Sequence, residues 1–118
     1  DVSMGYANVI WQADASAIAL CALQDARPGG FVLNLAGPER LRIREVAERF
    51  ARRFDRPAAI KGEESSQALL SNAAFCHEKY GPPTVTADQL IDWTADWLTN
   101  GGPTLNKPTR FEVADGRF

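Results

Sequence analysis

The clearest pattern in the sequence is a helical one in the middle of the chain. Apolar side chains recur every three or four positions over residues 43–54, charged side chains fill the positions between them, and Pro57 follows. This spacing predicts an amphipathic helix with one face on a core, and a proline just beyond it is a typical stop. The apolar stripe consists of Ile43, Val46, Ala47, Phe50, Ala51 and Phe54.

A second helix is predicted after Asp14, which we expect to be its N-cap. The apolar positions of this segment follow the i, i+3, i+4, i+7, i+8 rule, and Pro28, Gly29 and Gly30 end it. They are Ala15, Ile18, Ala19, Ala22 and Leu23.

Two more helices are predicted in the C-terminal half of the chain. A short one covers residues 72–80 and ends before Gly81. Thr86, with Gln89 three positions later, forms a capping-box signature for the last helix, which ends at the Gly101-Gly102 pair.

The strands are less distinct. Residues 5–11 alternate weakly and are rich in β-forming side chains, and residues 31–35 form a short apolar run of the kind buried in parallel sheets. A third strand is expected at 58–61, a polar loop at 63–67 and an irregular tail at 103–118, with a turn at Asp115-Gly116. The predicted fold class is therefore α/β: one small mixed domain over 1–118, with about three short strands and four helices.

Composition excludes several function classes. The chain has 118 residues, a formal net charge of -2 and a pI near 5.3, so no overall positive field attracts nucleic acid or an anionic membrane. Neither a membrane-length apolar run nor a signal peptide is recognisable, and we expect a cytoplasmic protein. Cys21 and Cys76 are far apart and His77 cannot complete a metal site with them, which predicts reduced thiols and no metal.

Seven arginines between Arg40 and Arg56 superficially suggest a nucleic-acid patch. Their spacing favours two solvated rows of ion pairs on one helix, because acids and arginines alternate four positions apart. The rows are Arg44, Glu48 and Arg52, and Glu45, Arg49 and Arg53.

Catalytic and cofactor-binding residues are not recognisable. A dinucleotide site needs a glycine-rich turn between a strand and a helix, whereas Gly29-Gly30 precedes a strand and Gly37-Pro38 lacks the further glycines. His77 has no evident nucleophile or acid partner and is expected on the surface of a short helix.

Asn8, Trp11 and Gln12 are the candidate binding residues. They bring two amides and an indole to the end of a strand where a helix begins, which is where α/β folds place ligands. The alternative interpretation is that Trp11 belongs to the core and that the amides satisfy backbone groups.

Two stretches, GYANVIWQADASAIALCAL and FVLNLAGPERLRIREVAERFARRFDRP, resemble the extended short-chain dehydrogenase/reductase (SDR) family, also called the NAD-dependent epimerase/dehydratase family. In that family a Val/Ile-rich strand leads into an Asp-capped helix, followed by a Tyr-Asn-x-Gly strand and an amphipathic helix that ends before Gly-Arg-Pro. Here Leu33-Asn34-Leu35-Ala36-Gly37 takes the place of the second strand, Asp55 stands where the family has Gly, and Arg42 replaces its capping Ser or Thr.

The resemblance implies a C-terminal, substrate-binding portion of a Rossmann-type extended SDR. The family's Tyr-x-x-x-Lys pair is missing, since Ile10 follows Tyr6 and Thr84 follows Tyr80 at the lysine spacing. The chain, which begins at Asp1 like an excerpt, is thus expected to be catalytically incomplete alone. NAD or NADP would bind the parent protein's N-terminal Rossmann domain.

The resemblance also suggests partners. Ala7 stands where relatives that act on nucleotide sugars carry an arginine, which favours a smaller polar substrate, such as a sugar acid or a hydroxy-ketone. We further expect a homo-oligomer, because residues 31–35 would leave an open strand edge in the isolated chain. The competing hypothesis is a non-catalytic binding or regulatory module with an SDR-derived fold.

Overall fold

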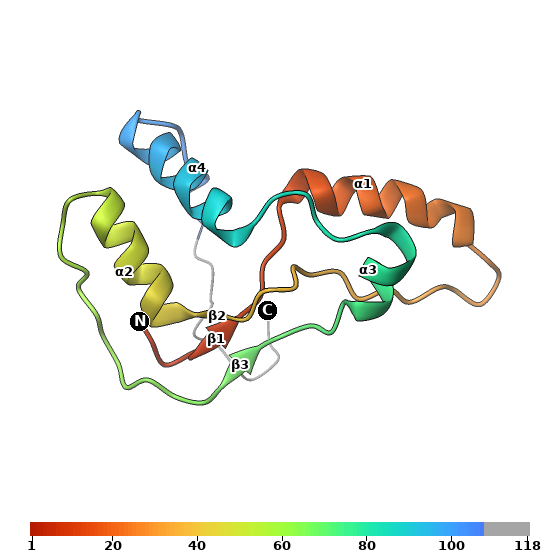
Figure 1. Cartoon of the computed structure of the whole chain (residues 1–118), viewed down its shortest axis with the longest axis horizontal. Coiled ribbons are helices and arrows are strands. Elements are labelled where there is room, and N and C mark those ends of the chain that lie inside the picture. The colour runs from red at the N-terminus through yellow and green to blue at the C-terminus, as the bar shows by residue number, and fades with distance from the viewer. Residues whose placement is uncertain (108–118) are drawn as a thin grey trace. The chain divides into compact units, whose positions relative to one another are not determined.

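The computed structural model describes residues 1–107, and this part of the chain is a small mixed α/β structure with three short strands and four α-helices (Figure 1). The elements are β1 (Tyr6–Ala7), α1 (Gln12–Ala22), the 3-10 helix η1 (Leu23–Asp25), β2 (Leu41–Arg42), α2 (Ile43–Arg53), β3 (Ala68–Leu69), α3 (Ala74–Tyr80) and α4 (Ala87–Thr99). They divide into two compact units. The first unit comprises Asp1–Ala7, Leu41–Leu69 and the chain from Ile91 onward; the second comprises Asn8–Arg40 and Leu70–Leu90.

The first unit contains the three-stranded sheet, with β1 in its centre. β1 pairs antiparallel with β2 and parallel with β3, so that Tyr6 lies opposite both Arg42 and Ala68. Gly5 is required beside this sheet, because a Cβ there would lie 2.0 Å from the carbonyl oxygen of Ser65. The absence of a side chain lets the two backbone segments approach closely.

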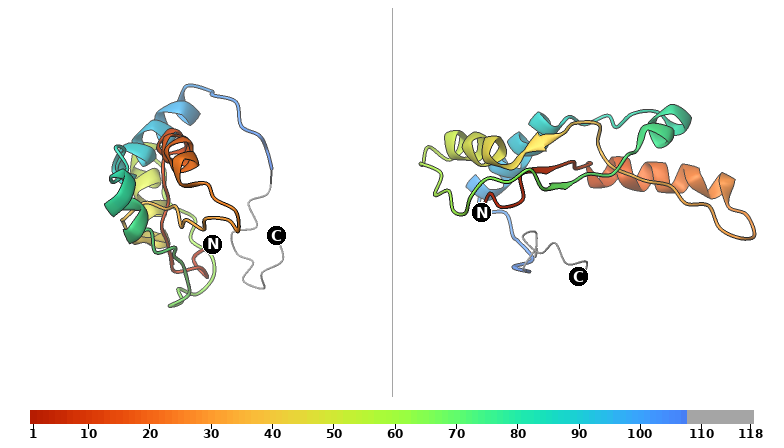
Figure 2. Two further views of the ribbon diagram at one scale, coloured as in Figure 1. Left: turned by 90° about the vertical axis from the view of Figure 1, so that its right-hand side faces the viewer. Right: turned by 90° about the horizontal axis from the view of Figure 1, so that it is seen from below.

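Helix α2 follows β2 without a connecting loop (Figure 2). Its observed bounds confirm the predicted amphipathic helix, and Arg42 occupies the N-cap without a side-chain capping bond, as expected where a Ser or Thr is replaced. Although the apolar stripe predicts a core-facing surface, no residue of α2 is fully buried.

The second unit has its own apolar core. Ile18 from α1, Ala36 from the connecting segment, and Ala73 and Cys76 at α3 form one buried cluster. Partly buried side chains pack around it: Ile10, Leu33, Leu35 and Tyr80. Burial raises the pKa of the Cys76 thiol, because the apolar surroundings disfavour the thiolate.

The prediction that Asp14 caps α1 is wrong. The helix begins at Gln12, its N-cap is Trp11, and Asp14 lies in the first turn. The Asp14 carboxylate instead accepts hydrogen bonds from the backbone N–H groups of Thr84 and Val85, at 3.0 and 3.1 Å, and from the Thr84 hydroxyl at 2.7 Å. The Asp14 carboxylate thus binds a loop that is distant in sequence. Such a long-range contact cannot be predicted from a local sequence pattern.

The predicted strands were only partly correct. Residues 5–11 contribute only β1, residues 31–35 and 58–61 form no strand, and β3 lies just beyond the predicted polar loop. Val32 is 92% exposed, so this apolar run is not buried on both faces. Strands of two residues depend on their pairing partners more than on side-chain periodicity, and a sequence pattern alone does not reveal those partners.

The two C-terminal helices confirm the sequence prediction. In the capping box, the N–H of Thr86 donates to Oε1 of Gln89 at 2.9 Å, and the N–H of Gln89 donates to the Thr86 hydroxyl at 3.2 Å. Residues 103–107 form neither helix nor strand, while the rest of the predicted irregular tail, including Asp115-Gly116, lies outside the described residues. Among residues 1–107, no helix combines the length and the apolar character needed to cross a membrane.

Candidate functional site

Asn8 connects three segments of the second unit. Its Nδ2 donates to the carbonyl oxygens of Gly37 at 3.1 Å and Ser71 at 2.9 Å, and its Oδ1 accepts from the Ser71 N–H at 3.1 Å. Both amide donors and the carbonyl oxygen are therefore bonded to backbone groups. This arrangement agrees with the interpretation that the Asn8 amide satisfies the backbone, and it leaves little of that side chain for a ligand.

Gly37 makes the Asn8 contact possible. A Cβ at Gly37 would lie 2.1 Å from the carbonyl oxygen of Val9, well inside any allowed contact distance. The segment after β1 and the segment before β2 therefore touch through their backbones, and a glycine is needed at this point of close approach.

Trp11 and Gln12 begin α1 directly beyond this backbone contact. Trp11 is 37% exposed, and Gln12, the first residue of the helix, is also exposed. The three predicted binding residues thus differ in role: Asn8 is engaged inside the unit, whereas Trp11 and Gln12 present surface at the start of α1.

A second polar cluster joins the end of α3 to η1. Asp25 accepts hydrogen bonds from the Lys79 ammonium and the Tyr80 hydroxyl. The bond from Lys79, followed by that from Tyr80, holds the pKa of Asp25 below its usual value. Burial, together with the bond to Asp25, raises the pKa of Tyr80 to about 12, so this phenol is a poor proton donor at neutral pH.

His77 is not the simple surface residue that the sequence predicted. It is half-buried, and its Nε2–H donates to the carbonyl oxygen of Ala36 at 2.9 Å. Ala36 belongs to the buried cluster, so the imidazole links α3 to the core of the second unit. The sequence of α3, a helix of seven residues, contains no pattern that predicts the contact between His77 and Ala36.

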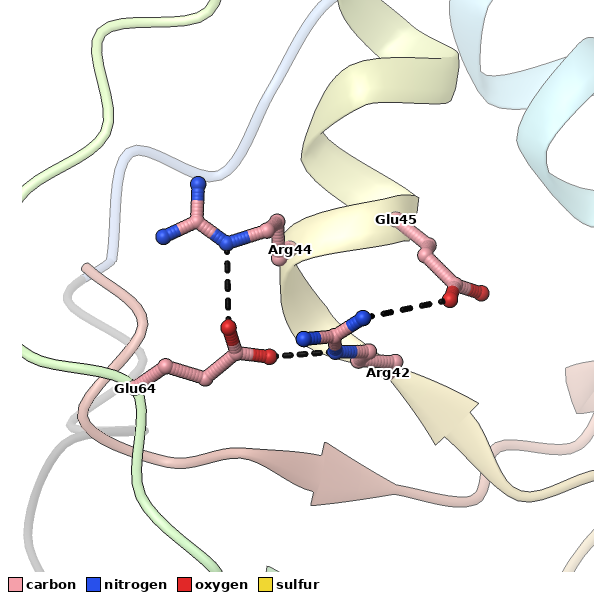
Figure 3. Close-up of polar contacts among 4 residues, drawn as sticks. All are labelled: Arg42, Arg44, Glu45 and Glu64. Atoms are coloured by element: carbon pink, nitrogen blue, oxygen red, sulfur yellow. Dashed lines mark hydrogen bonds and ion pairs between the residues drawn. The ribbon is translucent and has the colours of Figure 1, made fainter.

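The main charged cluster lies in the first unit. Glu64 accepts from Nε of both Arg42 and Arg44, and Arg42 also lies 3.7 Å from Glu45 (Figure 3). Hydrogen bonding from Arg42, and then from Arg44, lowers the pKa of Glu64. Because Glu64 comes from the predicted polar loop, this cluster fastens that loop to the start of α2.

The predicted rows of ion pairs along α2 need correction. Arg44 pairs with Glu64 and Arg53 pairs with Asp92, and both acids lie outside the helix. For Arg44 and Arg53, tertiary partners take the place of the predicted intrahelical ones, because a long arginine side chain reaches beyond its own helix. Arg42, Arg44 and Arg53 are part-exposed ion-pair partners, which agrees with the expectation of a solvated, charged face.

Metal-binding clusters are not found in the described part of the chain, where no three His, Cys, Asp or Glu side chains converge on one point. Cys21 is exposed and Cys76 is buried, and both are free thiols.

Comparisons of the chain with protein-family models, with curated proteins and with solved structures give no match.

Proposed function

We propose that this chain is the C-terminal, substrate-side portion of an NAD(P)-dependent oxidoreductase, epimerase or dehydratase of the extended SDR class. One observation carries the proposal. The two segments that resemble separate family motifs meet in the second unit, where Asn8 bonds to Gly37 across 29 residues of sequence. This contact between the two segments supports the proposal that they belong to one family-like unit.

Substrate contacts are assigned to Trp11 and Gln12, with Asn8 as the residue that positions them. Trp11 offers a part-exposed aromatic face, and Gln12 offers an amide donor and acceptor. Because Ala7 stands where relatives that act on nucleotide sugars carry an arginine, a small polar substrate, such as a sugar acid or a hydroxy-ketone, is proposed over a nucleotide sugar.

The reacting groups and the cofactor belong, in this proposal, to an N-terminal Rossmann domain of the parent protein. NAD or NADP supplies hydride transfer when bound to that domain. The chain itself binds and orients the substrate. The Asp14 carboxylate accepts hydrogen bonds from the N–H groups of Thr84 and Val85 and from the Thr84 hydroxyl, so we do not assign it as a general base.

Exposed apolar side chains of the second unit support an interface with the Rossmann domain or with a second copy. Val32 is 92%, Leu20 69% and Leu23 68% exposed, which is unusual for large apolar side chains that gather in one small unit. We also propose a cytoplasmic location and a homo-oligomeric parent.

The test is a set of substitutions in the full-length parent. We expect Trp11→Ala and Gln12→Ala each to lower kcat/KM by about tenfold or more while the melting temperature stays within a few degrees, because lost contacts to a bound substrate cost this much. Gln24→Ala, at another exposed amide of the same unit, is the matched control and should leave kcat/KM unchanged.

A parent protein in which Trp11→Ala and Gln12→Ala leave turnover unaffected would contradict the substrate assignment. A full-length parent that lacks NAD(P)-dependent turnover altogether would favour the non-catalytic binding or regulatory module.

A further inference from the structure

The C-terminal half of α2 borders a cavity of about 830 Å³ inside the first unit. The apolar stripe of α2 predicts a contact with the core, and yet no residue of this helix is fully buried. The cavity volume lies in the range of small-molecule sites, about 300–1,000 Å³. The stripe therefore faces a hollow large enough for a ligand.

Four segments wall this cavity: residues 1–2, α2, the turn after it and the end of α4. Phe50 and Phe54 stand on α2 with stacked rings, their centroids 5.9 Å apart and their planes 14° from parallel. Small side chains at Ala47 and Ala51 leave the space between the helix and the opposite wall, to which Leu98 of α4 contributes. The other walls are the N-terminal residues Asp1 and Val2 and the turn after α2, lined by Pro57, Ala58, Ala59 and Ile60. Aromatic and aliphatic walls of this kind suit a flat apolar group.

Two of the charged side chains at the cavity already have partners. Arg53 is paired with Asp92, and the Asp1 carboxylate accepts from the N–H of Ser3 at 2.8 Å and from its hydroxyl. The two other charged lining residues, Asp55 and Arg56, have no ion-pair partner within residues 1–107.

This pair presents one acceptor and one donor beside an apolar hollow. A ligand with a net charge would find one attractive and one repulsive partner, whereas a zwitterion satisfies both. Arg56 matches a carboxylate with its planar fork of donors, and Asp55 matches an ammonium group.

We propose that this cavity binds a small aromatic zwitterion, that is, an amino acid with an aromatic side chain. The ring lies against Phe50 and Phe54, the carboxylate meets Arg56 and the ammonium group meets Asp55. The lining belongs entirely to the first unit and includes neither Trp11 nor Gln12, so we assign the cavity to a second ligand and not to the substrate of the proposed reaction.

Three related probes test this assignment. They are L-phenylalanine, 3-phenylpropanoate, which lacks the ammonium group, and phenethylamine, which lacks the carboxylate. Titration is followed by amide chemical shifts of the chain. We expect saturable shifts at Ala47, Ala51 and Leu98 with L-phenylalanine, and about tenfold weaker binding of either analogue, because each loses one charged hydrogen-bonding partner.

Single substitutions assign the two head-group contacts. Arg56→Gln should weaken L-phenylalanine about tenfold and leave phenethylamine unchanged, and Asp55→Asn should weaken L-phenylalanine and leave 3-phenylpropanoate unchanged. Asn tolerates the positive φ of 49° at Asp55, so this variant keeps the turn. Arg52→Gln removes a neighbouring charge that does not line the cavity and is the matched control.

Ala51→Leu fills the hollow and should reduce the affinity for all three probes. The proposal is overturned if none of the probes gives saturable shifts at millimolar concentration, if all three bind equally, or if the shifts gather at Leu20 and Leu23 in the second unit. A result in which light scattering shows a dimer that Ala51→Leu dissociates would also overturn it, because the hollow would then hold a second copy of the chain.

Discussion

Removal of the Asn8 side chain tests how the second unit is held together. Asn8→Ala deletes three hydrogen bonds and leaves the carbonyl oxygens of Gly37 and Ser71 and the N–H of Ser71 without their partner. Each lost bond costs roughly 0.5–1.5 kcal/mol of folding free energy. Because Asn8 is half-buried, water can partly replace it, and we expect a total loss of about 2–4 kcal/mol.

Urea unfolding measures this loss. With a denaturant slope of about 1–3 kcal/mol per molar, a decrease of roughly 3 kcal/mol moves the midpoint down by about 1–3 M. Hydrogen exchange gives a local measurement, because the Ser71 N–H loses its acceptor and should exchange faster in the variant. Asn34→Ala, at an exposed asparagine of the same unit, is the control and should change stability by no more than about 0.5 kcal/mol.

An Asn8→Ala variant with an unchanged midpoint and unchanged Ser71 exchange would refute this role for Asn8. The amide would then be available to a ligand, as the sequence pattern had suggested.

Three further outcomes follow from the structure. Gly37→Ala should destabilise the second unit by more than about 2 kcal/mol, since its Cβ would meet a backbone oxygen at 2.1 Å; a normal melting temperature would contradict the close approach. The folded-state pKa of Asp25 is lowered, chiefly by the hydrogen bond from Lys79. The ionised Asp25 side chain therefore stabilises the fold at neutral pH, and this stabilisation is lost as the pH falls below 3.8 and through the folded-state pKa. Asp25→Asn should flatten the acid limb of a stability-against-pH profile. Thr86→Ala should cost about 1 kcal/mol by removing the capping box, and equal thermal midpoints for variant and wild type would show that α4 does not need this cap.

The helices could be predicted from the sequence because their signals are local. The apolar period of α2 and the Thr86–Gln89 capping box both lie within a few residues of the elements that they define. The strands could not be predicted in the same way. β1 is a strand because Leu41 and Leu69 supply its neighbours from distant parts of the chain, and residues 31–35 have the side chains of a strand without a partner in the described structure.

The candidate site could also be predicted only in part, because long-range contacts decide the role of each residue. Residue types pointed to Asn8, Trp11 and Gln12 together, but the Asn8 amide bonds to backbone groups 29 and 63 positions away. Asp14 likewise finds its partners 70 and 71 positions away, and so an expected helix cap became a link between segments. Sequence patterns identify polar residues near a strand end, whereas the fold decides which of them remain available.

We propose that this chain supplies the substrate side of a cofactor-dependent enzyme whose cofactor domain lies elsewhere in the parent protein. Titration of NADH and NADPH, followed by nucleotide fluorescence, into residues 1–118 alone and into the full-length parent tests it most directly. We predict binding with a micromolar dissociation constant by the parent and none by the isolated chain, which has no phosphate-binding glycine-rich turn. Micromolar binding by residues 1–118 alone, or no binding by the parent, would contradict the claim.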